Sequence, residues 1–363
     1  MNRRQILHAI NALGLNGTLP IAALAREESL GMAPTANPAR GAAHAAMQSD
    51  DTGWKIPTIG FAAVGEVARV CLPAGNDRIQ HFPYLSRTVA VDAFGSELSR
   101  VVADRTVLVT TPHGLGGLDA AEPTHTFARE LSDALTGLDM VILVTRPGGA
   151  TGFGTAAGVA QVLHEQGTVT LGLAVMPNDA DDLRRHLMAQ ADHRAIRRHL
   201  DGLITANHRD FDANFAKIPW RSTSAQIAPR ALRNLYQSIT LPVCRPGLVN
   251  VDFEDLRYLV LSHEGDCAFG FGSASAEAGV DSAFHSAIHV PEFRSNLLRH
   301  ACAAMVSITA PRQSVKLSAI SAAMKNMRRM MSPDAYVVYS VAESSSQSAD
   351  FTVGILLSGI LGT

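Results

Sequence analysis

The chain has 363 residues, of which 47% are hydrophobic and 18% are charged. This composition is typical of a folded protein that is long enough for two domains with sizeable cores, and it excludes an intrinsically disordered chain. The formal net charge of −2 excludes a general electrostatic attraction to nucleic acid or to an anionic membrane surface. No apolar run approaches the length that crosses a bilayer.

Residues 1–55 are predicted to form an extension that precedes the fold. Behind Arg3 and Arg4, apolar residues recur at helical spacing on one face, which suits a short helix that docks on a membrane surface or on a partner. A frayed amino-terminal helix explains the same pattern equally well, and a twin-arginine export signal ranks third. Residues 27–55 are rich in Ala, Gly, Pro and polar residues without periodicity, which indicates a linker.

From Ile56 onward, predicted strands and helices alternate along the chain. An unbroken apolar run indicates a buried strand, and a charged segment indicates an exposed helix. An alternating order of this kind predicts an α/β fold with a parallel sheet and helices on both faces. The expected strands are 56–64, 88–92, 106–111, 139–145, 168–176 and 203–206, and the expected helices are 124–135, 155–165 and 181–200.

A long helix follows, with Pro229 in its first turn and Pro242 expected to end it. In the last third of the chain, helices and strands follow in a different order. The last two strands of this part are expected to pair as antiparallel strands around a hairpin loop at 344–348. The methionines of its last helix are expected to fill a core. The expected helices are 252–262, 280–288 and 318–331, and the expected strands are 267–272, 301–309, 336–341 and 351–358.

The four cysteines show no pattern of disulfide or metal chemistry. They form no C-x-x-C pair, and no histidine lies at zinc-ligand spacing from two of them. We therefore expect reduced, buried thiols and no metal site. The four are Cys71, Cys244, Cys267 and Cys302.

A glycine-rich turn lies between the strand at 139–145 and the alanine-rich helix at 155–165. Glycines allow the backbone N–H groups of such a turn to converge on phosphate oxygens, and the amino end of the following helix adds a positive dipole. A turn that binds nothing is the alternative. The candidate residues are Gly148, Gly149, Ala150, Thr151, Gly152 and Gly154, and a second small loop after the third strand contains Gly114, Gly116 and Gly117.

An acidic loop follows the Pro246-Gly247 turn and holds Asn250, Asp252 and Asp255 at the start of a helix. Ionised carboxylates in this position are rarely buried without partners. Asp252 and Asp255 are three residues apart, so they share one helical face, as side chains of a functional site would. Helix capping is the alternative, because Asn and Asp favour helix starts.

Together, the glycine turn and the acidic loop resemble those of the tubulin/FtsZ superfamily, and of its bacterial FtsZ branch. The resemblance covers residues 56–363. It implies a tubulin/FtsZ-like fold with a parallel-sheet nucleotide-binding domain that includes a central helix, 56–242, and a smaller α+β domain, 243–363. It also implies that GTP, with Mg²⁺, is bound by the residues of both glycine loops, by Gly65 after the first strand and by Asn207 near the ribose. The acidic loop of the next subunit would then complete the site with Asn250, Asp252 and Asp255 as catalytic residues.

Three departures from the family pattern weaken the expectation of tight GTP binding. Glu66 brings a negative charge to the first loop, where a phosphate would approach. Asp92 lies in a segment that lacks the family's Asn-Thr-Asp motif. Arg230 stands where an acidic residue would read guanine. We therefore expect weak or slow GTP hydrolysis and leave GTPase activity open.

The function that this pattern favours is head-to-tail assembly of a cytoplasmic, FtsZ-like cytoskeletal filament, with the amino-terminal extension available for a membrane or an adaptor. The alternative is a tubulin-like scaffold that assembles without nucleotide turnover, for example in membrane remodelling. A dinucleotide-dependent oxidoreductase would need G-x-G-x-x-G after the first strand, and this chain has Gly60 to Glu66 without that pattern.

Overall fold

A computed structural model of the chain divides it into two units, Met1–Arg40 and Gly41–Thr363, and the structure described below is that of the second unit. The structure describes residues 48–49, 55–72, 75–109, 125–149, 151, 154–177, 183–207, 230–263, 266–290, 297–311, 316–344 and 350–360. The predicted docking helix at 1–25 lies outside these residues. None of the helices within them has the length and apolarity that a membrane span requires.

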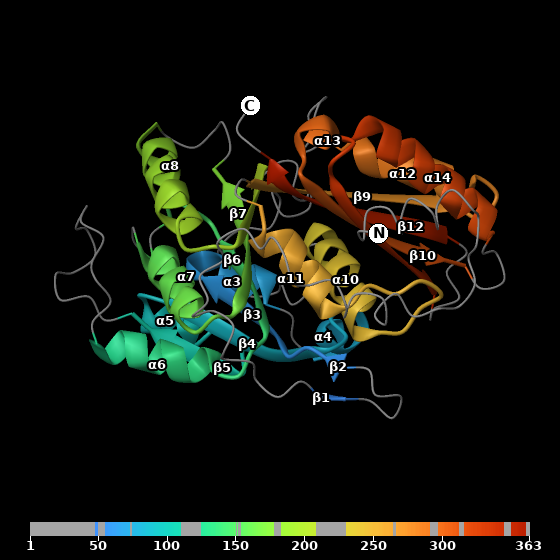
Figure 1. Ribbon diagram of the computed structural model, residues 1–363. Helices are drawn as coiled ribbons and strands as arrows, with labels where there is room; N and C mark the ends of the chain where they lie inside the picture. Colours follow the sequence, from blue (N-terminus) through green and yellow to red (C-terminus); the bar gives the residue numbers. More distant parts are fainter. Residues whose placement is uncertain are drawn as a thin grey trace, which may run out of the picture. The chain divides into compact units, whose positions relative to one another are not determined.

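Ten strands form one sheet in the order β11-β10-β12-β9-β8-β7-β6-β3-β4-β5 (Figure 1). The six strands from β3 to β8 run parallel, as the alternating sequence predicted. Two short strands at the start of the unit, β1 (Gln48–Ser49) and β2 (Lys55–Ile56), pair separately. The parallel strands are β3 (Ile59–Val64), β4 (Leu85–Asp92), β5 (Arg105–Leu108), β6 (Met140–Thr145), β7 (Val169–Met176) and β8 (Gly202–Asn207).

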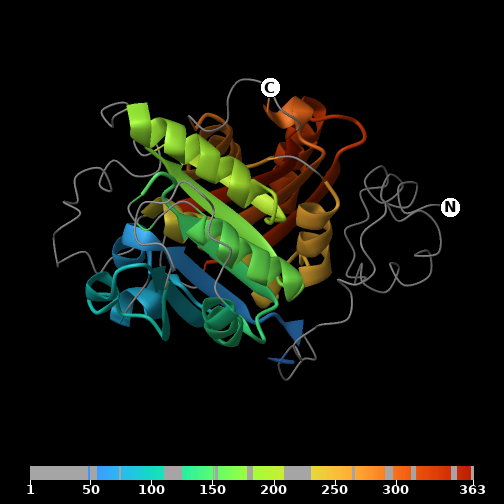
Figure 2. The same ribbon diagram turned by 90° about the vertical axis from the view of Figure 1, so that its left-hand side faces the viewer.

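Helices cover both faces of the parallel strands, and alternation along each strand assigns its side chains to one face or the other. In β3, Phe61 joins the core shared with α10 (Arg230–Cys244) and α11 (Phe253–Leu261). Ala62 joins the core on the other face, which is shared with α6 (His125–Leu135), α7 (Thr155–Glu165) and α8 (Leu183–Arg197). The helices α7 and α8 pack side by side (Figure 2). Short helices fill the other connections. The helices up to β8 are η2 (Gly65–Val67), α3 (Ala68–Cys71), α4 (Gly75–His81), α5 (Gly95–Leu98), α6 (His125–Leu135), α7 (Thr155–Glu165) and α8 (Leu183–Arg197).

The helix α10 (Arg230–Cys244) lies between the parallel strands and the last third of the chain. Its buried Tyr236 packs against Phe82, with ring centroids 4.9 Å apart, and donates a 2.6 Å hydrogen bond to the Pro83 carbonyl. The prediction that Pro242 ends this helix was wrong by two residues. A proline in the last turn removes only one backbone hydrogen bond, so the helix continues to Cys244.

The last third adds four strands to the same sheet and covers them with helices. The expected hairpin between the last two strands was wrong. Strand β10 lies between them, runs parallel to β11 and antiparallel to β12, and so prevents any direct pairing. The elements are α11 (Phe253–Leu261), β9 (Asp266–Ser275), α12 (Gly279–Ile288), α13 (Leu297–His300), β10 (Ala303–Ala310), α14 (Leu317–Met330), β11 (Tyr336–Glu343) and β12 (Asp350–Ile360).

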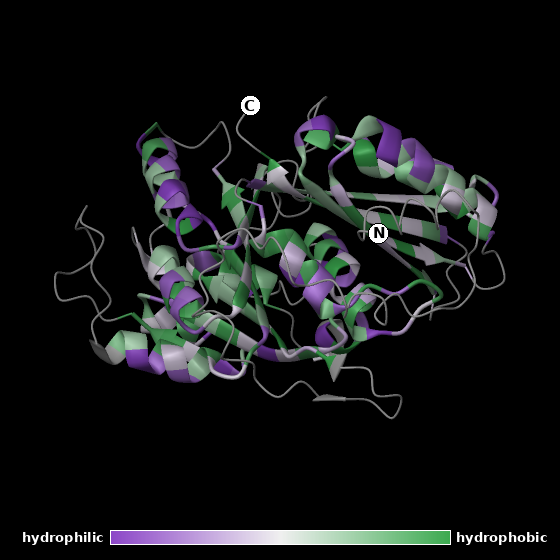
Figure 3. Ribbon diagram, in the orientation of Figure 1, coloured by the Kyte–Doolittle hydropathy of each residue, from purple (hydrophilic) through white to green (hydrophobic). Residues whose placement is uncertain are grey.

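The sheet is continuous across the predicted domain boundary, because β8 and β9 pair at Ile204 and Cys267. A continuous sheet does not divide the chain into domains, so the predicted domain boundary between residues 242 and 243 stays a prediction. The sheet is largely apolar, whereas α8 and α14 carry many hydrophilic residues (Figure 3). As expected, Met324 and Met327 fill the core beneath α14, and Cys71, Cys244 and Cys267 are buried free thiols. Cys302 is also a free thiol, but the expectation that it is buried was wrong, because it is only half-buried.

Candidate functional site

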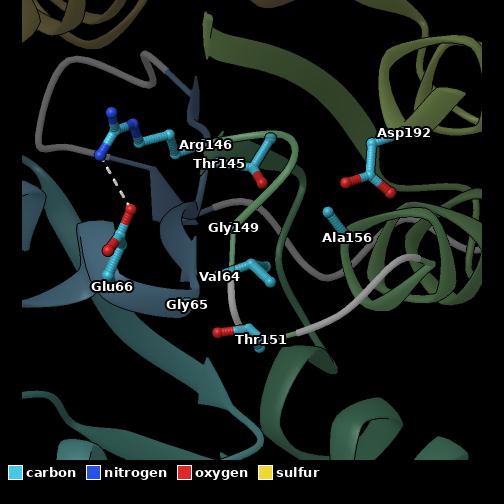
Figure 4. A pocket seen from close by; sticks show the side chains of 9 residues that line it. All are labelled: Val64, Gly65, Glu66, Thr145, Arg146, Gly149, Thr151, Ala156 and Asp192. Atoms are coloured by element: carbon cyan, nitrogen blue, oxygen red, sulfur yellow. Dashed lines mark hydrogen bonds and ion pairs between the residues drawn. The ribbon is translucent and has the colours of Figure 1, made fainter. Parts of the chain in front are cut away.

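A small pocket lies where β3 and β6 end, at the carboxyl edge of the parallel strands. This is the edge at which open α/β sheets bind ligands. The pocket is lined by residues that include Gly65, Glu66, Arg146, Thr151 and Asp192 (Figure 4). Its volume of about 20 Å³ is enough for about one water molecule.

The glycine turn lies along one side of this pocket and is packed closely against α8. Gly148 has φ +73, and a Cβ atom there would lie 2.6 Å from the carbonyl oxygen of Arg185. Gly154 has φ +92 and is the N-cap of α7. Both positions therefore require glycine for reasons internal to the fold. Of the other predicted residues of this turn, Gly149 and Thr151 line the pocket, whereas Ala150 and Gly152 lie outside the described residues.

Gly65 and Thr151 meet across the pocket although they come from different loops. Gly65 has φ +79, and a Cβ atom there would lie 2.7 Å from Thr151 Oγ1. The Thr151 hydroxyl donates a 3.1 Å hydrogen bond to Asp92 at the end of β4. Burial raises the pKa of Asp92, and hydrogen bonds from Phe94 and Thr151 offset part of that rise.

Two further predictions concern other loops at this edge of the sheet. Asn207 ends β8 at the same edge. The predicted Gly114, Gly116 and Gly117 lie outside the described residues.

Asp192 is a site residue that sequence reasoning missed. Its Oδ2 accepts a 2.8 Å hydrogen bond from the Gly148 N–H, and its Oδ1 accepts a 3.3 Å bond from the Gly154 N–H. Burial raises the pKa of this carboxyl, and the two hydrogen bonds offset part of that rise. A signal was present in the sequence, because Asp192 lies three residues after Ala189 and four before Ile196, which are both buried. The charged composition of 181–200 had indicated only an exposed helix.

Glu66 occupies the pocket as expected, but its charge has partners. Its Oε1 accepts hydrogen bonds of 2.9 Å from both Arg146 and Arg185. The Arg146 side chain is only 3% exposed. The pair with Arg146 is drawn in Figure 4. Because a buried guanidinium needs a counter-charge, Glu66 has a structural role here.

The acidic loop is built from hydrogen bonds within its own turn and with β11. Asn250 Oδ1 accepts a 2.6 Å hydrogen bond from the Gly247 N–H. Gly247 must be a glycine, because a Cβ atom there would collide with the carbonyl oxygen of Val341. Val249 forms an isolated antiparallel bridge with Val341. The loop is thus attached to β11 at the edge of the sheet.

The two acidic residues of this loop make different contacts. Asp252 is the N-cap of α11 and accepts a 2.8 Å hydrogen bond from the Asp255 N–H, as the capping alternative requires. Asp252 is an exposed residue, but the protein around its carboxyl group displaces part of the water there. This desolvation, and after it the nearby Asp255 carboxylate, raises the pKa of Asp252. Asp255 Oδ1 accepts a 2.6 Å hydrogen bond from the Tyr336 hydroxyl. The structure therefore brings Asn250, Asp252 and Asp255 together, and their catalytic role stays a prediction.

The two predicted half-sites lie far apart on one subunit. The acidic loop is attached to β11, the glycine turn follows β6, and strands β10, β12, β9, β8 and β7 lie between them. At about 4.8 Å per strand, this order separates them by on the order of 20–30 Å. Among the described residues, no group of three His, Cys, Asp or Glu side chains is placed to hold a metal ion.

Comparisons with known proteins agree with this architecture. No protein-family model matches the chain. It is 25% identical over 284 residues to the cell division protein FtsZ 1 of Pyrococcus furiosus, and the aligned region covers 76% of this chain and 74% of that protein. It is 28% identical over 281 residues to the cell division protein FtsZ of Buchnera aphidicola, and the aligned region covers 75% of this chain and 72% of that protein.

Solved structures share the fold at lower sequence identity. An empty FtsZ dimer from M. jannaschii superposes with a TM-score of 0.68 at 20% identity, over 83% of this chain and 88% of that one. The GTPγS-bound protofilament of CetZ2 from Haloferax volcanii superposes with a TM-score of 0.64 at 19% identity, over 84% and 93%. The fold is thus that of the tubulin/FtsZ class.

Within that class, the sequence similarity identifies the chain as a divergent FtsZ-like protein of the tubulin/FtsZ superfamily. Its similar proteins come from archaea as well as bacteria, so the expected bacterial branch stays a prediction.

Proposed function

We propose that this chain is a cytoskeletal protein that assembles head to tail into filaments. The observation that carries this proposal is the wide separation of the acidic loop, attached to β11, from the glycine turn after β6. The two segments cannot meet within one subunit, so a composite site requires a second copy. An interface between two different surfaces does not close on itself and generates a filament.

Exposed apolar side chains lie near both segments. Leu248, in the acidic loop, is 57% exposed. On α8, Leu183 and Leu187 are 73% and 57% exposed, on either side of Arg185, whose backbone contacts the glycine turn. Single exposed leucines are ordinary, but a leucine near each half-site suits a contact between two different surfaces. Similar structures that are a dimer and a protofilament also support self-association.

GTP with Mg²⁺ is the ligand that the family resemblance implies, and the described part of the glycine turn does not suit its phosphates. Two backbone N–H groups of the turn, those of Gly148 and Gly154, already donate to Asp192. We therefore propose assembly that does not depend on rapid nucleotide turnover. Slow hydrolysis is the second candidate, favoured by Asn250 and Asp252 being exposed beside Asp255 in one loop.

A location in the cytoplasm and a membrane or adaptor contact through residues 1–25 belong to the same proposal. The membrane or adaptor contact rests on the helical apolar pattern behind Arg3 and Arg4. The location rests on the implied ligand, because a GTP-dependent polymer would lack GTP outside the cytoplasm.

Mixing two interface variants tests the head-to-tail geometry. Leu248→Glu alters the acidic-loop surface, and Leu187→Glu alters the surface beside the glycine turn. We expect each variant alone to lose sedimenting polymer, and an equal mixture to stop at dimers in analytical ultracentrifugation, because each pair keeps one intact interface. Leu317→Glu, at another exposed leucine on α14, is the control and should assemble like the wild type. Normal filaments from both variants, or from their mixture, would contradict the proposal.

Phosphate release tests turnover separately from assembly. Wild type and Asp255→Ala are each measured with GTP and Mg²⁺ above the concentration at which they sediment. No release from wild type supports a scaffold without turnover. Release from wild type that is lost in Asp255→Ala filaments supports slow hydrolysis through Asp255. Equal release from both rejects the assigned role of this residue.

A further inference from the structure

The Asp192 carboxylate lies beneath the glycine turn and binds it as an anion would. It is 7% exposed, and each of its oxygens accepts one backbone hydrogen bond, from Gly148 at 2.8 Å and from Gly154 at 3.3 Å. Gly154 is also the N-cap of α7, so one oxygen lies at the positive end of a helix. Backbone N–H groups at a helix amino terminus are a common binding site for anions.

We infer that Asp192 is the resident anion of the glycine turn, so that the turn is closed without nucleotide and a phosphate reaches these two N–H groups only by displacing the carboxylate. This inference concerns the unassembled subunit and does not depend on the proposed filament.

The packing of the turn on α8 makes such displacement difficult. A Cβ atom at Gly148 would lie 2.6 Å from the Arg185 carbonyl oxygen and 3.1 Å from Ala189 Cβ, so the two backbones are in direct contact. Asp192 is one helical turn after Ala189 on the same face. Its carboxylate therefore cannot withdraw far while the turn stays packed against this helix.

The charges around the pocket oppose phosphate at the same place. Glu66 and Asp192 both line the pocket, and Asp92 accepts a hydrogen bond from the hydroxyl of Thr151, which also lines it. Arg146 and Arg185 both donate to Glu66 Oε1, so these two guanidinium groups already bind a carboxylate of the chain itself. A carboxylate and a phosphate repel each other, and they do so most strongly where water is largely excluded. A phosphate group would meet carboxylates in place of unoccupied N–H donors.

Nucleotide titration of wild type, Asp192→Gly and Asp192→Asn tests this inference. GTP and inorganic pyrophosphate serve as probes in calorimetry. We expect Asp192→Gly to bind both at least about tenfold more tightly than wild type, since hydrogen bonds between N–H groups and a charged group contribute that much. The buried Asp139→Asn is the matched control, because Asp139 Oδ2 accepts the Thr58 N–H at 2.8 Å. This control should leave binding unchanged.

Hydrogen exchange keeps the inference testable if the glycine variant does not fold. In nucleotide-free wild type, the Gly148 and Gly154 amides should exchange slowly, and in the nearly isosteric Asp192→Asn at least one should exchange about tenfold faster. Equal exchange in the two proteins would overturn the inference. So would wild-type GTP binding that Asp192→Gly weakens or leaves unchanged.

Discussion

The Tyr336 hydroxyl donates a 2.6 Å hydrogen bond to Asp255 Oδ1, which joins the start of β11 to the first turn of α11. The Tyr336 ring also meets Tyr258, one turn further along α11, edge to face at 5.0 Å between centroids. The acidic loop is therefore oriented by the edge of the sheet and not only by its own turn. Any contact of this loop with a second subunit depends on that orientation.

Replacing Tyr336 with Phe should lower the free energy of unfolding by about 1 kcal/mol, because it removes a hydrogen bond to a partly exposed carboxylate and keeps the ring. Urea denaturation measures the change. Tyr258→Phe keeps the same ring contact and should cost less than about 0.5 kcal/mol. If the two variants are equally stable, the Tyr336–Asp255 bond does not hold the loop. Sedimentation of Tyr336→Phe then tests whether loop orientation matters for assembly.

Replacing Asp252 separates helix capping from chemistry. Asp252→Ala should destabilise the protein by about 0.5–2 kcal/mol, because the Asp255 N–H loses its acceptor. Asp252→Asn keeps a capping oxygen without the charge and should retain most of the stability. Thermal or urea unfolding measures both. A stable Asp252→Asn variant that releases no phosphate, beside a wild type that does, would assign chemistry to the carboxylate.

Replacing Glu66 with Gln tests the charge balance of the pocket. We expect a loss of about 1–3 kcal/mol in the free energy of unfolding, because Arg146 is buried and would lose its counter-charge. Glu97→Gln is the matched control. Glu97 is 30% exposed, against 28% for Glu66, and also contacts two arginines, Arg69 and Arg100. Because Arg69 and Arg100 are both more exposed than Arg146, the control should cost less than about 1 kcal/mol. Equal losses would show that burial of Arg146 is not what matters.

The pH dependence of stability should reveal the burial of Asp192. Burial raises its pKa above the ordinary value of 3.8, and the hydrogen bonds from Gly148 and Gly154 offset only part of that rise. Asp192 therefore stabilises the fold fully only below pH 3.8, and this contribution is lost as pH rises through the raised pKa. Wild type should lose stability relative to Asp192→Asn across that window and then reach a constant difference. Urea unfolding of both proteins from about pH 3 to about pH 8 measures it.

Asp104→Asn is the control of opposite sign. Burial acts to raise the pKa of Asp104, but hydrogen bonds from Arg78 and Thr88 outweigh it, so the pKa is lowered. Its contribution is present above the ordinary value of 3.8 and is lost as pH falls through the lowered pKa. The wild type should therefore gain stability relative to Asp104→Asn as pH rises. Slopes of the same sign for Asp192 and Asp104 would contradict the assignment of the Asp192 pKa.

Local sequence alone was enough to predict most elements and the family. The helix α7 begins at Thr155 and ends at Glu165 as predicted, because glycines precede and follow an apolar, alanine-rich segment. Parallel strands followed from buried apolar runs that alternate with helices. The glycine turn and the acidic loop are each contiguous in sequence, so their patterns were visible without a structure.

Only the tertiary structure decided which distant groups meet. Asp192 and Gly148 are 44 residues apart, Glu66 and Arg185 are 119 apart, and Tyr336 and Asp255 are 81 apart. The insertion of β10 between β11 and β12 has the same origin. Periodicity reports the neighbours of a residue along its own helix or strand, whereas strand order and side-chain partners depend on the packing of the whole sheet. For that reason a glycine-rich turn between β6 and α7 was predictable from the sequence, and the carboxylate that accepts its hydrogen bonds was not.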